Sequence, residues 1–147
     1  MPASFYARAT LPFLVATMFL SGCGTANDGP ARFDISGKAT FDGQPIPIGK
    51  IIFEPDASKG NNGPQGFADI VKGEFDTKKT GKGTVGGPHK IRIQGYDGQP
   101  LEGRPQGKHL FLEWPTADDL PKETSTKDFD VPKKAADDLP KGPITPA

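Results

Sequence analysis

The feature that most constrains the fold is the strict alternation of residue types in "FDISGKATF", Phe33 to Phe41. Every odd-numbered position of this stretch is apolar or glycine, and every even-numbered position is polar. A repeat of two residues is typical of a β-strand with one buried face. Asp42-Gly43 follows directly, and this dipeptide favours a tight hairpin turn because both residues tolerate positive φ. The sequence therefore predicts a half-buried strand followed by a turn.

Six further short segments have the pattern of strands, and no helical period of 3.6 residues persists over ten residues. Glycine and proline number 19 and 16 of 147 residues, a composition that disfavours helices and suits short strands joined by turns. Seven such strands within residues 33–131 predict an all-β domain, a seven-stranded antiparallel β-sandwich. The additional strands are expected at Lys50–Glu54, Gly66–Val71, Glu74–Thr77, His89–Tyr96, Leu110–Trp114 and Ser125–Val131. Lys72-Gly73 is expected to form a second tight turn, between Gly66–Val71 and Glu74–Thr77.

The first 22 residues have the layout of an export signal. Arg8 is the only charge before an apolar run, Ala9–Leu20, which is too short to span a membrane as a helix. The run ends in Leu20-Ser21-Gly22-Cys23, which resembles the bacterial lipobox, where a peptidase cuts before a cysteine that carries a diacylglyceryl group. We therefore expect residues 1–22 to be a lipoprotein signal peptide and Cys23 to be the lipidated mature N-terminus.

Lipidation of Cys23 predicts the location of the protein. Two or three acyl chains, at about 0.8 kcal/mol per buried CH₂, would hold it on a membrane. We expect a cell-envelope protein on the extracytoplasmic side of its membrane. Gly24, rather than Asp, follows the cysteine, and by analogy with better-studied envelopes this permits sorting to the outer membrane. Cys23 is the only cysteine, so no internal disulfide is possible.

Both flanks of the predicted domain are rich in small or turn-forming residues. Residues 23–32 form a short tether between the lipid and the domain. Residues 132–147 ("PKKAADDLPKGPITPA") contain four prolines and few large apolar residues. Such a segment cannot bury enough apolar surface to fold alone, and the sequence predicts a disordered tail.

Four blocks of the sequence carry a family resemblance: "ISGKATFDGQPIPIGKIIFEPD", "GEFDT", "GGPHKIRIQGYDG" and "DLPKETSTKDFDVP". Over Phe33–Pro132 the chain resembles small lipoproteins of planctomycete-type bacteria that contain a transthyretin-like or carboxypeptidase-regulatory-like domain. The resemblance implies a transthyretin-like or Ig-like sandwich and an envelope location. It implies no enzymatic activity, because the regulatory domains flank catalytic domains and do not perform the chemistry.

Charge and motifs exclude several functions. Without Arg8 the chain has 17 basic and 18 acidic side chains. This balance argues against nucleic acid as a partner and predicts no attraction to anionic lipid beyond the acyl anchor.

His89 and His109 lack the short spacing of metal ligands and are expected to be ordinary surface or edge histidines. "KKTGKGT", from Lys78, lacks the order of a phosphate loop and predicts a flexible loop. No nucleophile accompanies either histidine, so we expect no catalysis and no cofactor.

Trp114 is the one candidate ligand-binding residue. Phe111 and Trp114 are three positions apart in a predicted strand, so we expect them on opposite faces, one of them in the core. The other could stack on a sugar ring. A metal-dependent enzyme that uses His89 and His109 is a further alternative, against which the 20-residue spacing of the two histidines argues. Two other functions fit the sequence better. The first is a structural or protein-binding module of the envelope, and the alternative is a carbohydrate- or peptidoglycan-binding module that uses Trp114.

Overall fold

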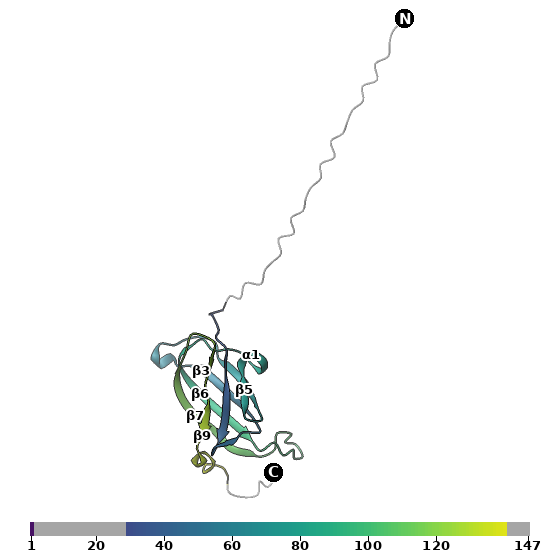
Figure 1. Ribbon diagram of the computed structural model, residues 1–147, viewed down its shortest axis with the longest axis vertical. Coiled ribbons are helices and arrows are strands. Elements are labelled where there is room, and N and C mark those ends of the chain that lie inside the picture. The colour runs from purple at the N-terminus through teal and green to yellow at the C-terminus, as the bar shows by residue number, and fades with distance from the viewer. Residues whose placement is uncertain (2–28, 141–147) are drawn as a thin grey trace.

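The computed structural model describes Met1 and residues 29–140 (Figure 1). Cys23 and the rest of the lipobox lie outside the described residues. Three short helical turns accompany the strands: η1 (Ala57–Lys59), α1 (Thr77–Thr80) and η2 (Lys133–Ala136). The strands are β1 (Ile35–Phe41), β2 (Gln44–Pro45), β3 (Ile48–Pro55), β4 (Gly66–Val71), β5 (Glu74–Asp76), β6 (Gly87–Tyr96), β7 (His109–Leu120), β8 (Ser125–Thr126) and β9 (Phe129–Val131).

The strands are hydrogen-bonded into one sheet that curls into a half-barrel, which confirms the all-β prediction. The strand order is β2-β1-β5-β4-β3-β6-β7, and β8 and β9 also pair with β1. Ser36 of β1 pairs with Asp76 on one side and with Thr126 on the other, so β1 lies inside the sheet.

The prediction of a wholly antiparallel arrangement is wrong at β1. Its pairs with β8 and β9 are parallel, with Ile35 opposite Ser125 and Ala39 opposite Phe129. The reason is the direction of β7, which ends at Leu120, opposite Gly87 at the start of β6. The chain leaves β7 at the end of the sheet where β1 begins, and so it returns alongside β1 in the same direction.

The predicted tight turns are confirmed. Asp42 and Gly43 have φ of 51° and 73°, and Lys72 and Gly73 have φ of 52° and 80°. Two successive residues with positive φ form the turn whose twist matches that of the flanking strands. These turns connect β1 to β2 and β4 to β5, and they set the register of both hairpins.

The core lies inside the curl of the sheet. Ile35 and Ala39 of β1 are buried, as the alternation predicts, and Ile91 and Ile93 of β6 are buried as well. Three phenylalanines from β3, β5 and β9 meet in this core. The ring centroid of Phe53 lies 6.2 Å from that of Phe75 and 6.2 Å from that of Phe129. The ring centroids of Phe75 and Phe129 lie 5.9 Å apart.

A β-bulge in β7 overturns the expectation for Phe111 and Trp114. Trp114 lies opposite Ile93 and Phe111 lies opposite Gly95, so β7 advances three residues while β6 advances two. The extra residue brings Phe111 and Trp114 to the same side, facing the core. Phe111 is fully buried, and Trp114 packs against the core cluster while partly exposed.

The disorder predicted for residues 132–147 does not hold at residues 133–136, which form η2. This turn packs against β7, and its Ala135 belongs to the core cluster. The Nζ of Lys134 lies 5.5 Å from the centre of the Trp114 ring. The segment is ordered because it covers core residues that the curled sheet alone leaves open. Residues 141–147 lie outside the described residues.

Candidate functional site

The topology places the start of the domain and the β6–β7 loop at opposite ends of the sheet. From β1 through β5, β4 and β3 to β6 each pair is antiparallel, so β1 and β6 run in the same direction (Figure 1). The ten residues of β6 span about 30 Å at roughly 3.3 Å per residue. We call the end formed by residues 29–34, 56–65, 77–86 and 121–124 the tether end. The distal end comprises residues 42–47, 72–73, 97–108 and 132–140.

At the tether end, the chain enters the domain between two loops. The guanidinium of Arg32 donates hydrogen bonds to the carbonyls of Gly83, at 2.6 Å, and Gln65, at 3.2 Å. Phe33 and Thr84 exchange backbone hydrogen bonds of 2.7 and 2.9 Å. The point from which a tether would extend is therefore fixed to the body of the domain immediately before β1.

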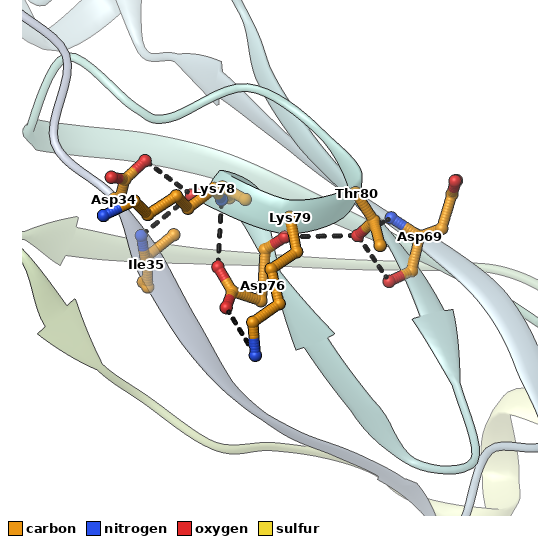
Figure 2. A network of polar contacts seen from close by, with 8 residues as sticks. Asp34, Ile35, Asp69, Asp76, Lys78, Lys79 and Thr80 are labelled. Carbon is orange, nitrogen blue, oxygen red and sulfur yellow. Dashed lines mark hydrogen bonds and ion pairs between the residues drawn. The ribbon is translucent and has the colours of Figure 1, made fainter.

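A buried threonine joins the start of β1 to α1. Thr77 is 1% exposed. Its hydroxyl oxygen accepts a 2.9 Å hydrogen bond from the backbone N–H of Ile35, and it lies 3.5 Å from a carboxylate oxygen of Asp34. In Figure 2, dashed lines from the labelled Asp34 and Ile35 to the start of α1 mark these two contacts. Because Ile35 is buried, its N–H has no access to water and depends on this hydroxyl.

The rest of α1 is fixed by polar contacts as well (Figure 2). Asp76 caps the turn by accepting from the N–H of Lys78 at 2.9 Å, and it pairs with Lys79 at 3.4 Å. The Thr80 hydroxyl donates to the carbonyl of Asp69 at 3.3 Å and accepts from its N–H at 3.2 Å. The flexible loop predicted from Lys78 to Thr84 thus begins as an ordered turn.

Asp56 fixes the β3–β4 loop at the same end. Its carboxylate accepts hydrogen bonds from the hydroxyl of Ser58, at 2.6 Å, and from the Ser58 N–H, at 3.1 Å. The ammonium of Lys90 lies 3.6 Å away. The Ser58 hydroxyl bond lowers the pKa of Asp56, burial opposes that effect, and the charge of Lys90 lowers the pKa further.

At the distal end, the β6–β7 loop has its own internal hydrogen bonds. Leu101 and Arg104 exchange backbone hydrogen bonds of 3.0 and 2.9 Å across a tight turn. At the base of the loop one carboxylate oxygen of Asp97 accepts from the N–H groups of Gln99 and Lys108, both at 2.9 Å. The β6–β7 loop is therefore ordered by its own hydrogen bonds, and it forms one side of a cavity.

A cavity of about 1080 Å³ lies between this loop, β7 and residues 139–140, which follow η2. Leu101 and Leu112, each 45% exposed, line it, and they are two of the three exposed large apolar side chains within residues 29–140. The rings of Tyr96 and His109 are in contact, with centroids 4.5 Å apart and ring planes tilted by 43°. Arg104 and Lys108 also line the cavity. We call this cavity, which Glu102 and Leu139 also line, the distal groove.

The two histidines considered as metal ligands lie far apart. His89 is 1% exposed and lies opposite Asp118, whereas the exposed His109 lies opposite Tyr96 at the other end of β6. The surface or edge position expected for His89 is wrong, since its side chain points into the core. Its Nδ1 donates to the carbonyl of Gly87 at 2.8 Å. Within the described part of the chain, no group of three or more metal-binding side chains occurs.

Trp114 lies away from the distal groove, packed against the core under Lys134. Sequence reasoning missed the groove because its walls come from the β6–β7 loop, from β7 and from the tail. The signal that could have indicated it is the 12-residue loop between β6 and β7, which is long for a hairpin.

Comparison with family models, curated proteins and solved structures yields no match to this chain. Among the residues that the structure describes, no helix is long and apolar enough to cross a membrane.

Proposed function

We propose that this protein is a lipid-anchored lipoprotein of the bacterial cell envelope that acts as a structural or protein-binding module and performs no catalysis. The sequence motif at Cys23 supplies the anchor. The observation that carries the proposal is the separation of the two ends: the chain enters the domain at Arg32, and the distal groove lies at the opposite end of the sheet. An anchored module with this geometry presents its groove away from the membrane.

The length of the tether sets the reach of the module. From Cys23 to Phe33 the chain can extend about 35 Å at most, at roughly 3.5 Å per residue. The sheet adds about 30 Å along β6. With a fully extended tether, the groove could stand up to about 65 Å from the lipid surface on the extracytoplasmic side, and with the domain resting on that surface it would stand about 30 Å away. Both distances allow it to meet other envelope proteins.

The lining of the distal groove favours a protein partner. Exposed leucines that line one cavity offer an apolar surface that a partner can cover. Arg104 and Lys108 form no ion pair with any other residue in 29–140, so their charges remain available at the rim. A polypeptide segment with an apolar side chain and a nearby carboxylate complements both features.

We also propose that the half-barrel is a variant of the transthyretin-like or Ig-like β-sandwich that the family resemblance implies. Contacts across the interior support this. The ring centroids of Phe41 in β1 and Phe111 in β7 lie 5.2 Å apart, and the ring of Phe53 in β3 contacts that of Phe129 in β9. The part of the sheet around β1 and β9 thus faces β3, β6 and β7 across a shared core, as two layers of a sandwich do.

Glycan binding remains the second candidate, with a different aromatic surface from the one predicted. The Tyr96–His109 pair lies in the groove and could stack on a sugar ring. Trp114 is less suited because it faces the core and Lys134 covers its ring.

The test combines anchoring and capture in living cells. A photo-cross-linkable residue at Leu101 should join the protein to one dominant envelope protein, whereas the same residue at Val71, which is exposed outside the groove, should not. Metabolic labelling with a fatty acid should mark the wild type and not Cys23→Ala. Glycan fragments at Leu101 would favour the second candidate. A wild-type protein without fatty acid, found in the cytoplasm, would refute the proposal.

A further inference from the structure

The chain is nearly neutral as a whole, but its charges are divided unequally between the two ends of the domain. The tether end has a net formal charge of +3, and the distal end has a net charge of zero. The tether end contains six basic side chains, Arg32, Lys59, Lys78, Lys79, Lys82 and Lys122, and three acidic ones, Asp34, Asp56 and Glu123. The distal end contains five of each sign: Lys72, Arg104, Lys108, Lys133 and Lys134, with Asp42, Asp97, Glu102, Asp137 and Asp138.

The lysines of the tether end are available to a partner. All five are exposed. Lys79 pairs with Asp76, but the other four form no ion pair with any residue that the structure describes. Of the acidic side chains, that of Asp56 is 4% exposed and lies against Lys90, which reduces its effect at the surface. The field outside this end is therefore positive.

The basic loops surround the point where the chain enters the domain. Arg32 is held by Gln65 from the β3–β4 loop and by Gly83 from the loop after α1. Lys59 belongs to the first of these loops and Lys82 to the second. A lipid anchored at Cys23, nine residues before Arg32, would keep these lysines close to the headgroups.

We propose that the tether end lies on a bilayer surface that contains anionic phospholipids, so that the lysines hold the domain upright with its groove pointing outward. This inference rests on the proposed lipid anchor for its orientation, and it replaces the expectation that charge contributes nothing to membrane binding. An anionic lipid surface fits better than a folded acidic protein. The charges lie on three separate loops and on the segment that enters β1, and they suit a diffuse layer of headgroups.

The test uses full-length chains with Cys23→Ala, so that no acyl chain contributes. Their partition is measured by sedimentation with vesicles of phosphatidylcholine alone and of phosphatidylcholine mixed with phosphatidylglycerol. All chains share the same N-terminal residues, so differences between variants report the domain. We expect stronger binding to the anionic vesicles and a loss of that preference in high salt.

Two triple variants then separate the ends. Lys59→Gln/Lys82→Gln/Lys122→Gln removes three charges from the tether end, and each lysine near an anionic surface is worth roughly a fivefold change in partition. We expect binding to anionic vesicles to fall at least tenfold. Lys72→Gln/Arg104→Gln/Lys133→Gln removes the same charge from the distal end and should change binding less than twofold.

Equal losses in the two triple variants, or equal binding of the Cys23→Ala chain to neutral and anionic vesicles, would overturn the inference. Circular dichroism spectra that match those of the parent chain exclude unfolding as the cause of either loss. Failure of the proposed function would be seen elsewhere, as the absence of fatty-acid label on Cys23, and the two failures are therefore distinguishable.

Discussion

Replacing Thr77 by valine tests whether the contact between β1 and α1 stabilises the domain. Valine keeps the shape and the β-branch of threonine but removes the hydroxyl that accepts from the N–H of Ile35. That N–H is buried and would be left without a partner. Such an unpaired group costs about 1–3 kcal/mol, and we expect the free energy of unfolding to fall by about 2 kcal/mol.

Thr80→Val is the matched control, because Thr80 belongs to the same turn and also forms hydrogen bonds but is exposed. Water can replace its hydroxyl, so we expect a loss of about 0.5 kcal/mol or less. In urea unfolding, a loss of 2 kcal/mol lowers the midpoint by about 1 M, since the slope is typically about 2 kcal/mol per M. Hydrogen exchange at Ile35 should accelerate only in Thr77→Val. Equal midpoints for the two variants would refute this account.

Three further predictions concern the core, the pH dependence and the tail. Phe53→Ala should lower the free energy of unfolding in urea by about 3–5 kcal/mol, because it opens a cavity between two phenylalanines. The pKa of Asp56 is lowered below its ordinary value of 3.8 in the fold. The ionised carboxylate therefore stabilises the folded state fully above that pH, and this contribution is lost as the pH falls through the folded pKa. In the Asp56→Asn variant the urea midpoint should decline less steeply with falling pH. Ala135→Asp should undock η2 and shift the fluorescence of Trp114, the only tryptophan, to longer wavelength.

Local patterns in the sequence predicted the elements that depend on neighbouring residues. The alternation around Ile35 placed β1 with the correct face inward, and the turns at Asp42 and Lys72 followed from the positive φ that their residue pairs tolerate. These features need only the side-chain period of a strand and the conformational range of glycine.

Features that depend on distant contacts could not be read from the same patterns. The bulge that turns Trp114 toward the core is a shift in the register between β7 and β6, and the residues of β7 alone carry no sign of it. The parallel pairing of β1 with β9 follows from where β7 ends. The segment that contains η2 is ordered because Ala135 packs into the core, although the composition of the tail favours disorder.

The distal groove is a further case, because its lining comes from segments that are separate in the sequence. Leu101 lies in the β6–β7 loop, Leu112 lies on β7, and Leu139 comes from the tail. Each is an ordinary surface leucine in its own segment. Only the fold brings them to one cavity beside Tyr96 and His109.

The position of β1 has a mechanical consequence. A pull between an anchored N-terminus and a partner at the distal groove would run along β1, the first strand of the domain. Hydrogen bonds in a sheet lie across the strands, so this force loads the bonds of β1 to β5 and β2 on one side, and to β8 and β9 on the other, in shear. Many bonds must then break together, and the domain should resist extension more strongly than a hairpin opened from its end.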